Sequence, residues 1–130
     1  MFMVSTRAIL LDRDGVLNRD RVDYVKCAEE LVMLDGSPEA VSALKAAGYT
    51  VLVVTNQSCV GKGILPMKGV VAINGLIRAA MMGAGGRIDA FYVCPHAPDA
   101  GCGCRKPAPG LMLQAAEDWG FDPAETWLVG

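Results

Sequence analysis

The stretch Ala8–Gly15 constrains the fold more than any other part of this sequence. Its first half, Ala8–Leu11, is an apolar run of the kind that forms a buried strand. Two carboxylates, Asp12 and Asp14, follow with one residue between them, and Gly15 permits a sharp turn. Because alternate residues of an extended chain share a face, both carboxylates can point toward the same place.

The carboxylates of Asp12 and Asp14 repel each other at this spacing unless a cation or a proton lies between them. A magnesium ion would relieve the repulsion through oxygen ligands. One carboxylate could then act as a nucleophile and the other as an acid and base. An ordinary strand end with an acidic turn would give the same pattern, so these residues alone leave both interpretations open.

The composition bounds the kind of protein this chain can be. It has 130 residues, of which 52% are hydrophobic, and this is enough for one compact domain. The net charge is only -2, without a basic stripe, so we expect neither nucleic acid nor a membrane as a partner. Met1–Arg7 contains too few apolar residues for a signal peptide. The five cysteines are an odd number, which does not fit a secreted disulfide scaffold. We therefore expect a cytoplasmic protein.

Strands and helices are expected to alternate along the chain. Ser37 is expected to cap the first helix, with Pro38 in its first helical position. Residues 19–30 have no clear period and are expected to form a loop beside the site. This alternation predicts an α/β fold with a parallel sheet and right-handed crossovers. The expected strands are 8–11, 50–54, 88–93 and 126–129, and the expected helices are 39–47, 67–82 and 109–119.

Polar side chains follow three of the predicted strands. The first strand is followed by the acidic pair, and the second ends in the polar run Thr55–Ser58. The loop after the third strand carries Arg105 and Lys106. Ligands of parallel sheets bind beyond the carboxyl ends of the strands, so these groups are expected to meet there. Each group suits phosphate or a metal ion.

A short loop rich in glycine and proline concentrates potential metal ligands. Cys94, His96, Cys102 and Cys104 supply three sulfurs and one imidazole within eleven residues, which matches a closed tetrahedral zinc site. Zinc would fold a loop that has almost no core and would fix the basic residues that follow it. Free thiols beside a lone histidine remain the alternative. Cys27 and Cys59 lack such partners and are interpreted as plain thiols.

Taken together, these motifs resemble the haloacid dehalogenase superfamily. The chain is most similar to its zinc-carrying branch, the D-glycero-D-manno-heptose 1,7-bisphosphate phosphatases, with the histidinol phosphatases close by. The resemblance implies a Rossmann-like three-layer sandwich with a parallel sheet, a minimal cap, a zinc-bound loop, a magnesium cofactor and a small phosphorylated sugar as substrate. The run Arg105–Met112 favours the heptose branch, whereas the short link from His96 to Cys102 is also compatible with a histidinol phosphatase.

The resemblance also implies a role for each matching residue. Asp12 would attack phosphorus to form an aspartyl phosphate, and Asp14 would protonate the leaving oxygen and then activate water. Thr55 and Lys106 would hold the transferring phosphoryl oxygens. Arg105 would recognise the substrate or its second phosphate. Asp12 and Asp14 would also bind magnesium. The sugar side would be lined by Asp20, Tyr24, Asn56, Gln57 and Ser58.

Two departures from the family pattern qualify these expectations. Cys59 stands where the family usually has glycine, and the family's last acidic residue would come directly after Gly130. We therefore expect one domain, residues 1–130, truncated at its C-terminus. Such a chain could be part of a phosphatase or a catalytically weak remnant that binds a phosphorylated sugar or a partner. The open sheet edge would then favour self-association.

Overall fold

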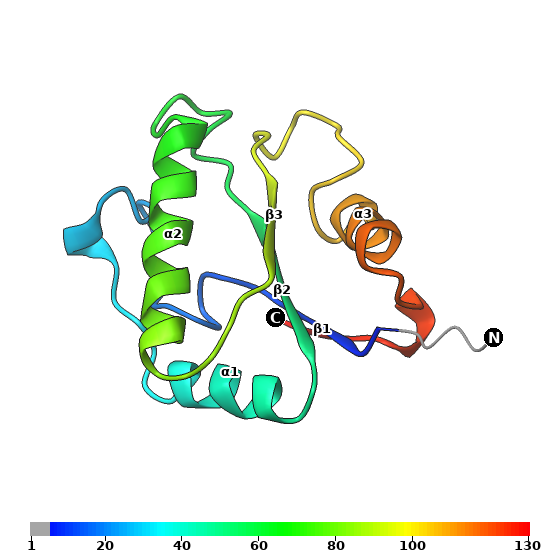
Figure 1. Ribbon diagram of the computed structural model, residues 1–130. Helices are drawn as coiled ribbons and strands as arrows, with labels where there is room; N and C mark the ends of the chain where they lie inside the picture. The colour runs from blue at the N-terminus through cyan, green and yellow to red at the C-terminus, as the bar shows by residue number, and fades with distance from the viewer. Residues whose placement is uncertain (1–5) are drawn as a thin grey trace.

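The computed structural model describes residues 6–130 as an α/β fold built around one sheet (Figure 1). All neighbouring strands are parallel, and their order across the sheet is β3-β2-β1-β4. The predicted alternation of strands and helices is therefore confirmed. The strands are β1 (Ala8–Leu11), β2 (Thr50–Asn56), β3 (Ala90–Cys94) and β4 (Trp127–Val129), and the helices are α1 (Ser37–Ala46), α2 (Met67–Gly83) and α3 (Gly110–Trp119).

The helices form layers on the two faces of the sheet. Figure 1 shows α1 and α2 on one side and α3 on the other. Alternate residues of β1 and β2 serve the two layers, as strand geometry requires. On the first face, Leu11, Val51 and Val53 pack in a cluster that includes buried residues of α1 and α2. On the second face, Leu10, Leu52 and Val54 pack in a cluster that includes buried residues of α3.

The start of α1 differs from the expectation. Ser37 does not cap the helix, because Gly36 occupies the cap position with a φ of 86° and Ser37 is already helical. The buried hydroxyl of Ser37 instead donates a hydrogen bond to the carbonyl oxygen of Leu17 at 2.7 Å. Because Ser37 lies inside the helix and not at its cap position, its side chain ties α1 to the loop after β1.

Other boundaries move by one or two residues. β2 continues beyond the predicted apolar run to Asn56, which carries its polar end further into the site. β3 begins at Ala90 rather than Ile88, and the Asp89 carboxylate just before it accepts a hydrogen bond from the Val51 backbone N–H at 2.9 Å. The short strand β4 lies at one edge of the sheet. Self-association through this edge stays a prediction.

Within residues 6–130, no helix combines the length and the apolar character that crossing a lipid bilayer requires.

Candidate active site

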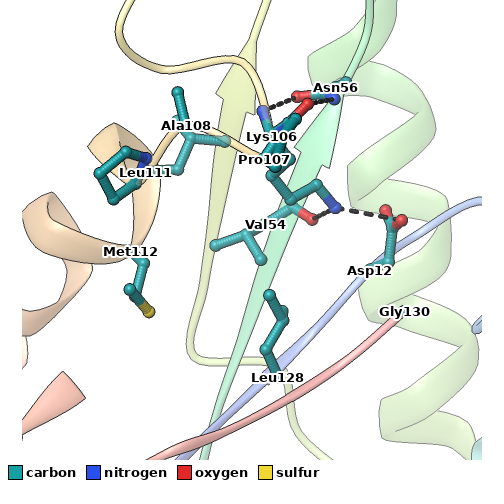
Figure 2. Close-up of a pocket in the computed structure, with 11 residues that line it drawn as sticks. Asp12, Val54, Asn56, Lys106, Pro107, Ala108, Leu111, Met112, Leu128 and Gly130 are labelled. Atoms are coloured by element: carbon teal, nitrogen blue, oxygen red, sulfur yellow. Dashed lines mark hydrogen bonds and ion pairs between the residues drawn. The ribbon is translucent and has the colours of Figure 1, made fainter. Parts of the chain in front are cut away.

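Charged groups from two segments meet beyond the carboxyl ends of the strands. Asp12 directly follows β1, and its backbone N–H donates to the Val129 carbonyl of β4 at 2.9 Å. The ammonium group of Lys106, from the loop after β3, lies 3.0 Å from the Asp12 Oδ2 atom. Figure 2 shows this ammonium group facing the Asp12 carboxylate. It also donates to the Val54 carbonyl at 2.8 Å, so Lys106 is fixed by two partners.

Asn56 holds the backbone of Lys106. Its Oδ1 atom accepts from the Lys106 N–H at 3.0 Å, and its Nδ2 atom donates to the Lys106 carbonyl at 3.2 Å (Figure 2). Asn56 thus has a structural role, and its predicted contact with the sugar stays a prediction. The clamp joins the end of β2 to the loop after β3.

A buried arginine organises the surroundings of Asp14. The side chain of Arg13 is 1% exposed, and its Nη2 atom lies 3.1 Å from the Asp14 Oδ1 atom. Asn18 donates to the same oxygen at 2.9 Å, and Gln57 donates to Oδ2 at 2.6 Å. The Asp14 side chain still exposes 21% of its surface. The carboxylate is thus held on its protein side and remains accessible.

Gln57 makes its hydrogen bonds inside the protein. Its side chain is buried, with Nε2 donating to Asp14 and, at 2.9 Å, to the hydroxyl of Thr55. Its Oε1 atom accepts from Arg13 at 3.1 Å. These bonds orient Asp14 and Thr55, and the predicted sugar contact of Gln57 stays a prediction. Because the Thr55 hydroxyl accepts this bond, its own proton remains available for a phosphate oxygen.

The loop after β1 reaches the loop after β2 through Tyr24. This residue has a φ of 66°, which is unusual for a side chain other than glycine, and its hydroxyl lies 3.0 Å from the Ser58 hydroxyl. The Lys62 ammonium donates to the same phenol oxygen at 2.7 Å, and this hydrogen bond lowers the pKa of Tyr24. Asp20 is exposed in the same loop. The proposed sugar contacts of Asp20, Tyr24 and Ser58 stay predictions.

The predicted cysteine and histidine ligands converge. One ligand atom from each of the four residues lies within 4.8 Å of every other. The Cys94 sulfur is 3.1 Å from the Cys104 sulfur, and the His96 Nδ1 atom is 3.2 Å from Cys104. Hydrogen bonding to Cys94, together with burial, raises the pKa of Cys104 to about 12. Sulfurs in a tetrahedral zinc site lie about 3.8 Å apart, so the cluster has nearly the size that zinc requires.

Two glycines pack this cysteine loop, residues 94–106, against its neighbours. A Cβ atom on Gly61 would lie 2.5 Å from the Ala97 backbone nitrogen, and one on Gly110 would lie 2.5 Å from the Gly103 carbonyl oxygen. The loop is therefore fitted between the loop after β2 and the start of α3. Arg105 lies within it, and its Nη1 atom is buried without a hydrogen-bond partner among residues 6–130.

A cavity of about 470 Å³ opens beside the Asp12–Lys106 pair. Its polar edge contains these two residues and Asn56, as Figure 2 shows. The rest of its wall is mainly apolar. That part is formed by Val54, Pro107, Ala108, Pro109, Leu111, Met112, Leu128 and Gly130.

Three polar residues of this network had no predicted role: Arg13 and Asn18 contact the Asp14 carboxylate, and Asn74 contacts Arg13. Arg13 stands between the two carboxylates, where an exposed arginine would be ordinary. Asn18 is fully buried, yet its position in a loop gave no signal. Asn74 could have been found from the sequence, because it is a polar residue on an otherwise apolar buried face of α2.

Comparison with known proteins gives consistent matches. A family model of the haloacid dehalogenase-like hydrolases matches residues 6–130. The D-glycero-beta-D-manno-heptose-1,7-bisphosphate 7-phosphatase of Pseudomonas aeruginosa is 40% identical over 127 residues, which are 98% of this chain and 71% of the relative. The enzyme of the same description from Pseudomonas putida is 41% identical over 124 residues, covering 95% of this chain and 71% of the relative.

A solved structure agrees with these relatives. The D,D-heptose 1,7-bisphosphate phosphatase from B. bronchiseptica, crystallised with magnesium and phosphate, matches with a TM-score of 0.92 and 40% identity. The match covers 96% of this chain and 70% of that chain. The predicted resemblance and the predicted Rossmann-like fold are both confirmed.

Proposed function

We propose, from the premise that this chain belongs to the haloacid dehalogenase-like hydrolase family, that its substrate is D-glycero-D-manno-heptose 1,7-bisphosphate. The chain is a phosphoric monoester hydrolase by its family and its relatives. One observation carries the proposal. Asp12 pairs with Lys106 on one side, and on the other it is followed in the chain by Arg13, which holds Asp14. The relatives at about 40% identity are named for this substrate, and this favours the heptose branch over histidinol phosphate.

In the proposed reaction, Asp12 attacks the phosphorus atom. Its Oδ1 atom accepts the backbone N–H of Arg13 at 2.7 Å, and its Oδ2 atom faces Lys106, so the carboxylate is oriented before substrate arrives. Lys106 and the Thr55 hydroxyl hold the phosphoryl oxygens as charge develops on them. The bond from phosphorus to the sugar oxygen breaks, and Asp14 gives that oxygen its proton.

The second half of the reaction restores the enzyme. Asp14 now accepts a proton from water, and the resulting nucleophile attacks the phosphorus of the aspartyl phosphate. The bond to Asp12 breaks, inorganic phosphate leaves, and the free carboxylate returns to its contact with Lys106. One group therefore serves as acid and then as base, which explains why Asp14 is held firmly but left partly exposed.

The donor set beside Asp12 fits magnesium. The carboxylate of Asp12 is 29% exposed, and the Asp14 backbone carbonyl accepts no hydrogen bond from residues 6–130. The Asp14 carboxylate is already bonded to neighbouring side chains, so we assign its contribution to this carbonyl. When bound, magnesium would offset the negative charge of the phosphate and of Asp12. The B. bronchiseptica phosphatase was crystallised with magnesium and phosphate.

We also propose that Cys94, His96, Cys102 and Cys104 bind one zinc ion. With four protein ligands the coordination is complete, and this makes the zinc structural rather than catalytic. Its effect would be to order the segment that ends at Arg105 and Lys106. The unpaired Nη1 atom of Arg105 supports a contact with the second phosphate of the substrate.

The experiment compares phosphate release from heptose 1,7-bisphosphate, as both anomers, with release from histidinol phosphate, in the presence of magnesium. We expect one heptose anomer to give the highest kcat/KM, with no release by Asp12→Asn. A higher kcat/KM for histidinol phosphate would contradict the assigned substrate. Release that persists in Asp12→Asn would contradict the proposed nucleophile.

A further inference from the structure

We propose that Asn74, in the middle of α2, is a positioning residue for Asp14 and acts through the buried guanidinium of Arg13. The proposal rests on the phosphatase reaction above and assigns a role in it to a helix that lies outside the strand ends. Asn74 would not touch substrate. It would determine how the acid and base is presented to the leaving oxygen.

Asn74 is unusual for its place in the helix. The buried residues of α2 are Val70, Ile73, Asn74, Ile77 and Met81, and Asn74 is the one polar member. Its side chain is 5% exposed. Asparagine is a mediocre helix former, and burying its amide is costly unless the amide is hydrogen-bonded. The Asn74 Oδ1 atom has such a bond, because it accepts from the Arg13 Nη1 atom at 3.0 Å.

The guanidinium of Arg13 is held at both of its ends. Nη1 donates to Asn74, and Nη2 donates to Gln57 at 3.1 Å. Nε and Nη2 face the Asp14 Oδ1 atom at 3.4 and 3.1 Å. Since the group is a rigid planar fork, acceptors from α2 and from the loop after β2 fix the plane that meets Asp14.

Loss of the Asn74 acceptor would change the orientation of the Arg13 guanidinium. The Nη1 atom would become a buried donor without a partner, and such donors are costly. The guanidinium would turn to satisfy it and would carry Asp14 with it. Proton transfer requires Asp14 to lie within hydrogen-bond reach of the leaving oxygen, so a small rotation weakens it.

A purely structural role for Asn74 makes a different prediction. If the hydrogen bond of Asn74 served only the packing of α2, its loss would lower kcat/KM equally for every substrate. Misplaced proton transfer affects only leaving groups that need a proton. A sugar alkoxide needs one, whereas p-nitrophenolate leaves as a stable anion. The value of kcat/KM includes only the steps up to departure of the leaving group, so it isolates this difference from the later hydrolysis of the aspartyl phosphate.

The experiment compares three variants of α2 on heptose 1,7-bisphosphate and on p-nitrophenyl phosphate. Asn74→Leu removes the acceptor while keeping the number of side-chain heavy atoms, and Asn74→Asp keeps an acceptor for Arg13. Ile77→Val trims the apolar side of the same helix as the matched control. We expect Asn74→Leu to lower kcat/KM for the sugar phosphate about tenfold, part of the roughly 10²–10⁴-fold that proton transfer contributes. Its kcat/KM for p-nitrophenyl phosphate, and both values in Ile77→Val, should stay near wild type. Asn74→Asp should recover the sugar phosphate rate.

A second measurement does not depend on activity or magnesium. The Nη1–H signals of Arg13 in NMR spectra, which report the donor that Asn74 accepts, should be protected from exchange in wild type and in Asn74→Asp, but not in Asn74→Leu. Equal losses on both substrates, or an unchanged Arg13 signal, would overturn the inference. If wild type released no phosphate from any sugar phosphate, the proposed function would fail, and the Arg13 signal would still decide whether Asn74 holds the guanidinium.

Discussion

Asp14 and Lys106 reach the same site from regions that are built in different ways. Asp14 is surrounded by buried side chains of the loops after β1 and β2, linked through Arg13 to α2. Lys106 comes from the cysteine loop, where three of the four potential ligands are not fully buried. The first region is ordered by ordinary packing and hydrogen bonds. The second has little core of its own and depends on the clustered ligands and on the Asn56 clamp.

The two regions illustrate two ways in which a small domain can hold charged side chains in place. A buried polar network needs a core around it, and α2 and the sheet provide one. A loop on the surface lacks that core and needs a local cross-link, which the proposed zinc site would supply. The two regions should therefore respond differently to substitution, to metal removal and to pH.

The largest effect should come from the residue between the two regions. Asp12→Asn should abolish turnover by several orders of magnitude, because an amide cannot form the covalent intermediate. It would also remove the ion pair with Lys106. Phosphate release and urea unfolding measure the two consequences separately. Asp35→Asn, in an exposed turn, is the control and should keep full activity. Comparable activity in the two variants would disprove the assignment.

Breaking the cysteine loop should have the next largest effect. Cys102→Ser should lose the zinc, which we expect at about one per chain in the unaltered protein. Activity should fall about 10–100-fold, since Lys106 loses its support. Metal analysis and amide exchange of residues 95–106 are the measurements.

Cys27→Ser is the matched control for that experiment, because Cys27 is an exposed thiol outside the cluster. It should change neither the zinc content nor the activity. A chain that lacks zinc yet shows full amide protection in the cysteine loop would show that hydrogen bonds alone order this region.

Forcing the two regions apart should have a moderate effect. The Cβ atom of Gly61→Ala would meet the Ala97 backbone, so the loop after β2 and the cysteine loop would have to separate. We expect a loss of about 1–3 kcal/mol in the free energy of unfolding, typical of overpacking. Zinc affinity should fall with it.

Gly75→Ala should change the free energy of unfolding in the opposite direction to Gly61→Ala. Its Cβ atom would meet no other atom within 4 Å, and it lies in the middle of α2. We expect it to stabilise the protein by about 0.5–1 kcal/mol, the usual gain of alanine over glycine in a helix. Urea unfolding of both variants tests the pair, and destabilisation by Gly75→Ala would show that α2 is less tolerant than its geometry indicates.

The smallest effect should appear in the exposed loop of residues 19–30. The Arg21 guanidinium bonds to the Asp23 carboxylate and lowers the pKa of Asp23 to about 2, and Lys26 adds a second hydrogen bond. Because the folded pKa lies below the ordinary value of 3.8, this stabilisation is complete above that pH. It is lost as the pH falls through 2. The protection of the amides of residues 21–30 from exchange should therefore fall over the same pH range.

Asp23→Asn gives the control for the pH experiment. At about pH 6 the variant should show slightly weaker protection of this loop than wild type, and the difference should vanish as the pH falls below about 2. A difference that persists in acid would mean that the carboxylate charge is not what orders the loop. The exposed ion pairs are screened by solvent, so the effect should be small.

Much of the candidate site was predictable because its signals are local in the sequence. The apolar run before Asp12 is a strand, and β1 has the predicted bounds. The ligands from Cys94 to Cys104 lie within a short loop that brings them together by its own closure. The parallel sheet rule then placed Lys106 beside Asp12 without further information.

The hydrogen-bond partners of the asparagine and glutamine side chains depend on tertiary packing. Asparagine and glutamine can donate and accept in any direction, so their sequence positions do not reveal their partners. Nothing in the sequence indicated that Asn56 clamps the Lys106 backbone or that Gln57 bonds to Asp14. Asn74 meets Arg13 across 61 positions of sequence, and no local pattern encodes that pairing. The amino-acid sequence therefore determined the strands, the acidic pair and the ligand cluster, whereas the packing of α2 against the sheet selected the residues that hold Asp14.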